Sequence, residues 1–206
     1  MQTIQTYPIY KNGLVKEALK DAMSYDQYKL LVAQHAQDGS SSGSEVTESL
    51  VDYTMLNHRR MKRWSKTLRL ESDVLNTLAA KKTAVAWLVI TESWCGDAAH
   101  ATPVMEKFAL ENPNISLKVV LRDEHPALMD AFLTNDARSI PKLIAFDLEN
   151  DTIIADWGPR PTNATELVND YKATHGALTP EFKQDLQMWY NKDKGRDIAN
   201  DLLSLL

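Results

Sequence analysis

The sequence predicts an α/β fold in which helices flank a mixed β-sheet. Residues 84–90 form a short, continuous apolar run, which is typical of a strand that is buried on both faces. Helical and strand-like patterns alternate after this run, and this order favours parallel strands joined by a crossover helix. Two further strand-like segments, 142–146 and 152–157, are separated only by a turn at 149–151, so they should form an antiparallel hairpin.

The region before the sheet, residues 1–82, is predicted to be a helical extension. Ser24 and Gln27 have the spacing of a capping box, which predicts a helix that ends where the glycine- and serine-rich segment 39–43 begins. This segment is typical of a flexible loop or linker. A long helix is then expected over about 45–70, because its apolar side chains recur at helical spacing: Leu50, Tyr53, Met61, Trp64 and Leu68.

The elements after the buried strand complete a predicted core at 83–176 and a C-terminal helix at 177–206 that packs on it. Asn163 caps a helix that ends at Gly176, and Pro180 occupies the favoured first-turn position of the last helix. The other elements expected within the core are helices at 95–110 and 126–133 and a strand at 115–121.

The composition is that of a globular protein and excludes several kinds of partner. The chain has 206 residues and a net charge of −5, so the molecule as a whole does not attract nucleic acid or acidic membranes. The N-terminus lacks a basic region followed by an apolar one, and the run at 84–90 is too short to cross a bilayer. We therefore expect a cytoplasmic protein. Its single cysteine excludes a disulfide within the chain.

Cys95 is the residue best placed for chemistry, because it follows the buried strand and begins the predicted helix. At a helix N-terminus, free N–H groups and the positive end of the helix dipole stabilise a thiolate. The pKa of such a cysteine can fall from about 8.5 to roughly 3.5–7.5. The alternative is that a lone cysteine is a small buried apolar side chain. The strand–loop–helix position favours a partly exposed, reactive Cys95.

Three separated segments resemble the thioredoxin superfamily. Residues 94–96, Trp-Cys-Gly, stand where the family has W-C-G-x-C, and Pro103 follows where thioredoxins carry a proline that kinks this helix. Residues 138–143, Arg-Ser-Ile-Pro-Lys-Leu, resemble the family's R-S-I-P-T-L segment. The resemblance covers about 84–176. It implies a thioredoxin-like fold in which Pro141 follows a cis peptide bond and faces the reactive cysteine.

The chain departs from this family at positions that matter for chemistry. Ala98 replaces the second cysteine, which resolves the mixed disulfide in a two-thiol mechanism. Val89 stands where thioredoxins have a buried aspartate that assists proton transfer, and Lys142 replaces the threonine after the cis-proline. The helical extension and residues 157–161, Trp-Gly-Pro-Arg-Pro, also resemble a bacterial subgroup of thioredoxin-like proteins.

The resemblance assigns roles to the active-site loop and to the cis-proline segment. Cys95 would attack or hold a disulfide partner, Trp94 would cover the thiol, and Gly96 would permit a tight turn. Pro141 and the backbone of Ile140 would dock an extended peptide by strand-like pairing.

Charged residues around Cys95 are expected to act on it in opposite directions. Asp97 and Glu92 flank the thiol and would oppose thiolate formation, whereas Arg138 on the cis-proline loop would favour it. His100 lies off the helix face that pairs best with Cys95, so we expect a surface histidine rather than a base.

The long N-terminal helix carries a further candidate site, a run of basic residues. The run comprises His58, Arg59, Arg60, Lys62, Arg63, Lys66 and Arg69. We expect a solvated helix face, with a site for nucleic acid or phosphate as the alternative. The five histidines do not have the spacing of a metal site, and Cys95 alone cannot form a zinc site, so no metal or cofactor is expected.

Two functions remain open at the level of sequence. The first is monothiol thiol–disulfide exchange through Cys95, with a protein or a low-molecular-weight thiol or disulfide as partner. The second is a non-catalytic thioredoxin-fold module that binds a protein or peptide. The reactivity of the thiol separates the two, because a redox protein needs an accessible and acidic cysteine.

Overall fold

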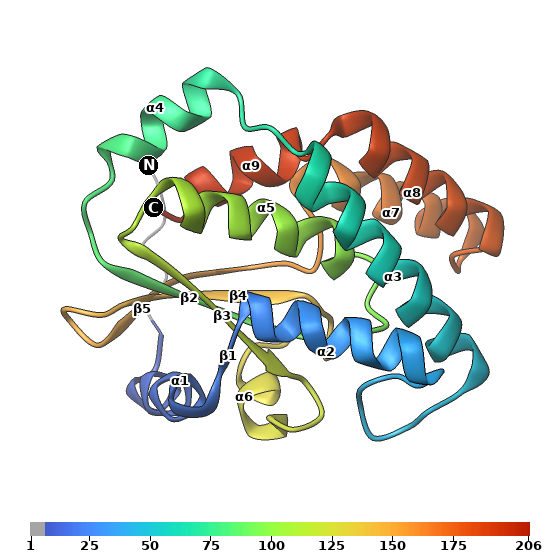
Figure 1. The fold of residues 1–206 in the computed structure, drawn as a ribbon, viewed down its shortest axis with the longest axis horizontal. Helices are drawn as coiled ribbons and strands as arrows, with labels where there is room; N and C mark the ends of the chain where they lie inside the picture. Colours follow the sequence, from blue (N-terminus) through green and yellow to red (C-terminus); the bar gives the residue numbers. More distant parts are fainter. Residues whose placement is uncertain (1–6) are drawn as a thin grey trace.

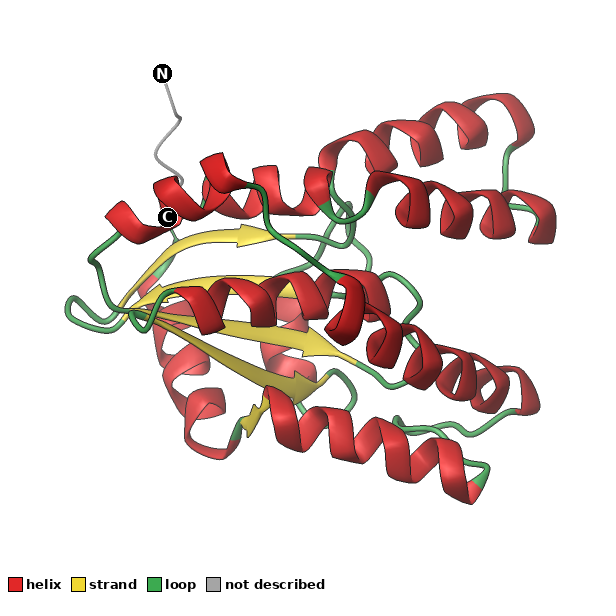
Figure 2. Ribbon diagram, turned by 45° about the horizontal axis from the view of Figure 1, so that its top comes forward, coloured by secondary structure: helices red, strands yellow, loops and turns green. Residues whose placement is uncertain are grey.

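A computed structural model describes residues 7–206 and shows a five-stranded mixed sheet with helices on both faces (Figures 1 and 2). The strand order is β1-β3-β2-β4-β5. This arrangement confirms the predicted mixed α/β fold. The strands are β1 (Met23–Ser24), β2 (Val85–Thr91), β3 (Ile115–Leu121), β4 (Lys142–Asp147) and β5 (Thr152–Trp157).

Strand β2 is the centre of the sheet. It pairs in parallel with β3 and antiparallel with β4, and β4 continues into the predicted antiparallel hairpin with β5. All seven residues of β2 are buried, as its continuous apolar sequence predicts. The helices are α1 (Ile9–Asp21), α2 (Tyr25–Asp38), α3 (Glu48–Thr67), α4 (Ser72–Ala80), α5 (Ala98–Glu111), α6 (Pro126–Ala131), α7 (Thr162–His175), α8 (Pro180–Asp193) and α9 (Arg196–Leu203).

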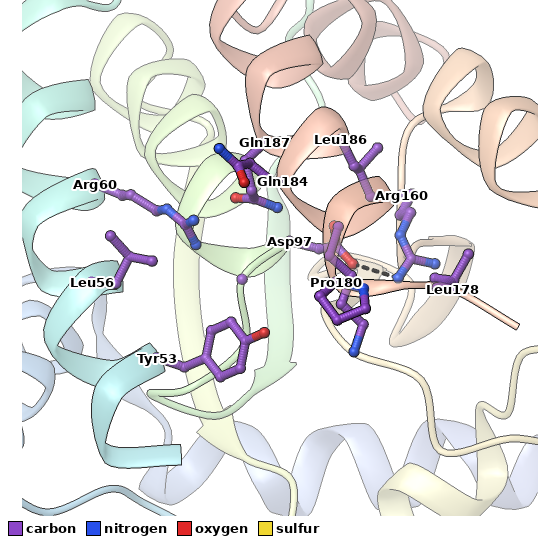
Figure 3. A pocket seen from close by; sticks show the side chains of 12 residues that line it. Tyr53, Leu56, Arg60, Asp97, Arg160, Leu178, Pro180, Gln184, Leu186 and Gln187 are labelled. Atoms are coloured by element: carbon purple, nitrogen blue, oxygen red, sulfur yellow. Dashed lines mark ion pairs between the residues drawn. The ribbon is translucent and has the colours of Figure 1, made fainter. Parts of the chain in front are cut away.

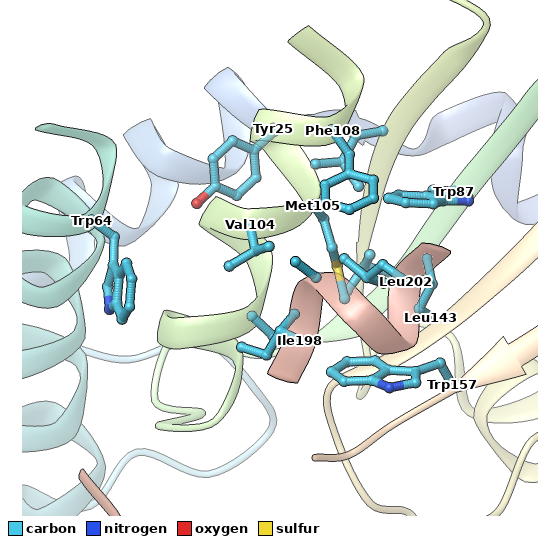
Figure 4. Packing of buried hydrophobic residues seen from close by; sticks show 14 of the residues in the cluster. Tyr25, Trp64, Trp87, Val104, Met105, Phe108, Leu143, Trp157, Ile198 and Leu202 are labelled. Carbon is cyan, nitrogen blue, oxygen red and sulfur yellow. The ribbon is translucent and has the colours of Figure 1, made fainter. Parts of the chain in front are cut away.

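Alternation along β2 divides the core into two clusters. Trp87 points into the larger one, which also contains Phe108 and Met105 of α5 and Leu202 of α9 (Figure 4). Leu88 points into the smaller one, which α1 and α6 cover. Side chains on a strand alternate between the two faces, so one apolar run supplies both clusters.

Several elements differ from the sequence prediction. The long helix α3 is shorter at both ends than 45–70, and α1, α4 and β1 were not predicted individually. The single helix expected after Pro180 is two helices, because the chain turns at Lys194 and Gly195, both at positive φ. An added Cβ at Gly195 would lie 3.0 Å from Val104, so the turn is packed closely on α5.

The N-terminal segment reaches both edges of the sheet. Strand β1 pairs antiparallel with β3 at one edge. At the other edge, Asn12 on α1 accepts a hydrogen bond from the backbone N–H of Ile153 at 3.3 Å. The hydroxyl of Tyr7 donates to the carboxylate of Asp156 at 2.7 Å in the same strand. The first helical residues are therefore part of the sheet's architecture.

Two expectations concern membranes and export. The segment 1–6, which contributes to the absence of a secretory pattern, lies outside the described residues. Within 7–206, no helix combines the length and the apolar character needed to cross a bilayer.

Candidate functional site

The loop between β2 and α5 carries Cys95. The backbone N–H of Cys95 donates to the carbonyl of Glu92 at 3.1 Å, and the N–H of Ala99 donates to the carbonyl of Cys95 at 3.2 Å. Helix α5 begins at Ala98 rather than at Cys95, because residues 93–97 form turns. Cys95 therefore lies immediately before the helix.

The Cys95 thiol is buried and protonated at neutral pH. Only 6% of the residue is exposed, and its Sγ donates to the carbonyl of Ile140 at 3.2 Å. Burial, followed by the negative charge of Asp97, raises the pKa of Cys95 to about 12. The N–H of Ala98 and the guanidinium of Arg160 lower this pKa but do not outweigh burial. The prediction of a partly exposed cysteine with a lowered pKa is wrong.

The segment 39–43 is a loop, which is one of the two predicted alternatives, but hydrogen bonds hold it on the active-site loop, whereas we expected a flexible segment. Ser42 and Ser93 exchange two hydrogen bonds, in which each backbone N–H donates to the other's hydroxyl at 2.9 and 2.7 Å. The Ser42 hydroxyl also donates to the carboxylate of Glu92. Gly43 has φ 98°, and an added Cβ would lie 2.9 Å from a carboxylate oxygen of Asp123.

The side chains that precede Cys95 are held by neighbouring loops. The indole N–H of Trp94 donates to the carbonyl of Ser42 at 3.1 Å, and the Arg122 guanidinium lies 4.9 Å from the centre of the Trp94 rings. Glu92 is fully buried and accepts the backbone N–H of Asp123 at 2.9 Å. Burial raises the pKa of Glu92. Trp94 thus packs against the segment 39–43. We expected its side chain to cover the Cys95 thiol instead.

The cis-proline segment lies opposite Cys95 and is covered by the segment 157–161. The Ile140–Pro141 and Gly158–Pro159 peptide bonds are both cis. Gly158 has φ 119°, and an added Cβ would overlap the carbonyl oxygen of Pro141. The carbonyl of Ile140 accepts a hydrogen bond from the Cys95 thiol. Docking of a peptide against Ile140 and Pro141 stays a prediction.

The structure contradicts the expected charge effect of Arg138 and the expected backbone role of Gly96. Arg138 forms a bidentate ion pair with Asp130 at 2.6 and 2.7 Å on the surface, so the expectation that it acts on the thiol is wrong. The cation that lowers the pKa of Cys95 is Arg160. Gly96 has no positive φ, so the turn does not require glycine there, and the expected role of Gly96 is wrong as well.

Asp97 is buried between a cation and a phenol. Its carboxylate accepts from Arg160 at 2.8 Å and from the hydroxyl of Tyr190 on α8 at 3.0 Å. Burial raises the pKa of Asp97, while Arg160 opposes the increase. Asp97 therefore links the active-site loop to the C-terminal helices.

His100 also links the start of α5 to the C-terminal helices. It is buried, with 1% of the residue exposed. It stacks on Tyr190 with ring centres 4.4 Å apart. The indole of Trp64 donates to its Nδ1 at 2.9 Å, so Nε2 carries the proton and donates to Gln187 at 2.7 Å. Burial lowers the pKa of His100 to about 3. The expectation of a surface histidine is wrong, because α3 and α8 cover this side of α5.

Two adjoining cavities form a cleft in front of the active-site loop. Their volumes are about 380 and 420 Å³, and both are lined by Tyr53, Gly96, Asp97, Arg160 and Lys183. The first also contains Arg60, and it opens between α3 and α8 (Figure 3). The second cavity is also lined by Cys95, Trp94 and Ile140.

Sequence reasoning missed the cations of this cleft. Arg60 belongs to the basic run that we expected to be a solvated face, but it is half-buried and turns toward Gly96. Arg160 lines the cleft from the segment 157–161. The family resemblance of this segment does not indicate a role for its arginine. In the part of the chain that the structure describes, no group of three His, Cys, Asp or Glu side chains could hold a metal ion.

Comparison with known proteins places the fold in a family. A family model described as thioredoxin matches residues 43–172, more than half of the chain. A crystal structure of a protein of unknown function from Pseudomonas aeruginosa is similar, with a TM-score of 0.54 and 18% identity, over 73% of this chain and 83% of that chain. A crystallised HIV epitope-scaffold has a TM-score of 0.53 and 18% identity, over 73% of this chain and 84% of that chain. The comparison with curated proteins gives no match. The buried strand, the Cys95 loop and the matched residues agree, and the chain belongs to the thioredoxin superfamily.

Proposed function

We propose that this thioredoxin-fold protein binds a ligand in the cleft in front of Cys95 and does not perform a two-thiol redox cycle. The binding part rests on the two adjoining cavities beside Cys95. The absence of a redox cycle rests on the only cysteine, which is buried with its pKa raised to about 12. The thiolate is the nucleophile in disulfide exchange, and at neutral pH this thiol holds its proton. Ala98 offers no second sulfur to resolve a mixed disulfide.

The second candidate is monothiol exchange. It is supported by the position of Cys95 among the residues that line the second cavity. In this reaction the Cys95 thiolate attacks a disulfide, forms a mixed disulfide and releases one thiolate of the partner. An external thiol then attacks the mixed disulfide and restores Cys95. The partner would be a protein or a low-molecular-weight thiol or disulfide.

The pH dependence of alkylation separates the two candidates. The folded protein is treated with iodoacetamide at a series of pH values, and the modified fraction is followed by intact mass. We expect modification of Cys95 to be much slower than that of free cysteine at neutral pH, because the pKa is raised. The chain unfolded in guanidinium, in which Cys95 is accessible, should react at the rate of an ordinary cysteine.

A second measurement tests exchange directly. The protein is incubated with hydroxyethyl disulfide, and adducts on Cys95 are counted by mass. The binding proposal predicts almost no adduct on the folded chain. A midpoint of alkylation below about 8.5 together with a rapid adduct would replace the binding proposal with monothiol exchange.

A further inference from the structure

Three cations from different elements line the cavity between α3 and α8. Arg60 comes from α3, Arg160 from the segment after β5 and Lys183 from α8. In Figure 3, Arg60 and Arg160 approach the cavity from opposite sides, with Asp97 between them. An added Cβ at Gly96 would lie 3.5 Å from Nη1 of Arg60, so this guanidinium reaches the residue next to Cys95.

The walls of this cavity carry fewer negative than positive side chains. Asp97 is the one carboxylate among the residues that line the cavity between α3 and α8, and it is already bound to Arg160 and Tyr190. Within residues 7–206, neither Arg60 nor Lys183 forms an ion pair; Arg60 donates to the amide oxygen of Asn57 at 3.0 Å. The described walls therefore carry an excess of positive charge.

Arg60 is partly removed from water and forms no ion pair among the described residues. Burial lowers its pKa and Arg63 lowers it further, while Tyr53 and the more distant charge of Asp97 raise it without outweighing burial. A charged group that loses water is unfavourable unless an opposite charge or hydrogen bonds replace the hydration. An anion in the cleft would supply both, since a guanidinium binds carboxylate and phosphate groups with paired hydrogen bonds.

Part of the cavity wall is apolar. Tyr53 and Leu56 on α3 face Leu178 and Pro180 across the cavity (Figure 3). Its volume of about 380 Å³ is in the range of small-molecule sites. An apolar surface beside unmatched cations fits a molecule with an apolar body and an anionic group.

We propose that the cleft binds a small organic anion, whose carboxylate or phosphate group is held by Arg60 and Lys183 and whose apolar part packs on Tyr53 and Leu56. This inference rests on the proposed binding function and defines the class of ligand. The hydroxyl of Tyr53 and the amides of Gln184 and Gln187 line the same cavity and are available for further hydrogen bonds.

Phenyl phosphate and benzoate are suitable probes, with benzyl alcohol as the uncharged comparison. Binding to the full chain is measured by calorimetry and by chemical-shift changes at low and high salt. We expect both anions to bind, benzyl alcohol to bind at least about tenfold more weakly, and affinity to fall as salt rises. Arg60→Gln and Lys183→Gln should each lower the affinity for both anions by about tenfold or more.

Arg59→Gln is the matched control, because Arg59 is exposed on the same helix and does not line the cleft. Its affinity for the probes should equal that of the unmodified chain. Lys183 is exposed, so Lys183→Gln keeps the test valid if Arg60→Gln fails to fold. Absence of probe binding to the unmodified chain, or equal losses in Arg59→Gln and the two cleft variants, would overturn the anion proposal.

Cys95→Ser distinguishes this proposal from the one on which it rests. If anions bind equally to Cys95→Ser, the anion site is independent of the thiol, as the inference requires. If the unmodified chain forms a rapid mixed disulfide but binds neither anion, both proposals are overturned. If it forms the adduct and also binds the anions through Arg60 and Lys183, the anion site stands and the protein is a monothiol exchanger.

Discussion

The protonation of Cys95 depends on two opposing effects of unequal size. A helix N-terminus stabilises a negative charge by about 0.3–1 kcal/mol, which is less than one pKa unit at about 1.36 kcal/mol per unit. Complete burial can shift a pKa by up to about 3–5 units. Cys95 is buried and faces Asp97, so these effects exceed the favourable N–H groups and Arg160. The position before α5 alone therefore does not make the cysteine acidic.

Substitutions of the two nearby charges should move the pKa of Cys95 in opposite directions. Asp97→Asn removes a negative charge and should lower this pKa, because Asp97 raises it; the Asn oxygen can still accept from Tyr190. Arg160→Gln should raise the pKa further. Rates of iodoacetamide modification at alkaline pH report both shifts. A change of the same sign in both variants would show that altered exposure, and not charge, controls the thiol.

Single residues show where sequence reasoning about the site reaches its limit. Cys95 and Ala98 could be placed at the start of α5 by their motif, and the family resemblance places Ile140 opposite Cys95, where its carbonyl accepts a hydrogen bond from the thiol. His100 could not be placed, since its burial depends on α3 and α8, which are distant in sequence. Arg60 could not be distinguished from the solvated arginines of its own helix, because helical periodicity does not identify a cavity.

At the level of elements, the contact between the segments 157–161 and 140–141 depends on a glycine. Gly158 has φ 119°, and any Cβ there would overlap the carbonyl oxygen of Pro141. Gly158→Ala should lower the free energy of unfolding by roughly 1–3 kcal/mol or more, as measured by denaturant titration. Gly13→Ala in α1 is the control, because an added Cβ meets nothing within 4 Å. It should raise the free energy of unfolding by about 0.5–1 kcal/mol; equal effects of the two substitutions would contradict this account.

The regular elements followed from local patterns more completely than their contacts did. The apolar run at 84–90 predicts β2 to within one residue at each end. The start of α5 shifts by three residues because the loop uses Gly96 and Asp97 in turns. The glycine- and serine-rich segment 39–43 has the composition of a linker, and its ordered conformation depends on hydrogen bonds to Ser93 and Trp94. Composition cannot reveal such contacts between separate parts of a chain.

At the level of the whole molecule, His100 makes stability depend on pH. Its pKa is about 3 in the folded state and about 6.5 when unfolded. Between these values the unfolded chain binds a proton that the folded chain does not, so the free energy of unfolding falls as pH decreases from 6.5 toward 3. Glu92 and Asp97 have raised pKa values in the folded state, so their contributions to the free energy of unfolding increase as the pH decreases.

The His100→Gln variant isolates this contribution, since it keeps hydrogen-bonding groups for Trp64 and Gln187. Urea unfolding of both proteins from about pH 7 to about pH 4 should show a steeper loss of stability in the unmodified chain. Parallel pH profiles would mean that His100 has the same pKa in the folded and unfolded protein, contrary to its buried environment.

The position of the N-terminal segment has a consequence for behaviour at high concentration. An unpaired edge strand is a template on which another chain can add a strand, and this is a common route to aggregation. Here β1 occupies the free side of β3, while Tyr7 and Asn12 engage β5. Residues 7–24 therefore cover part of both edges of the sheet, and their local detachment would leave both edges more open to strand addition by another chain.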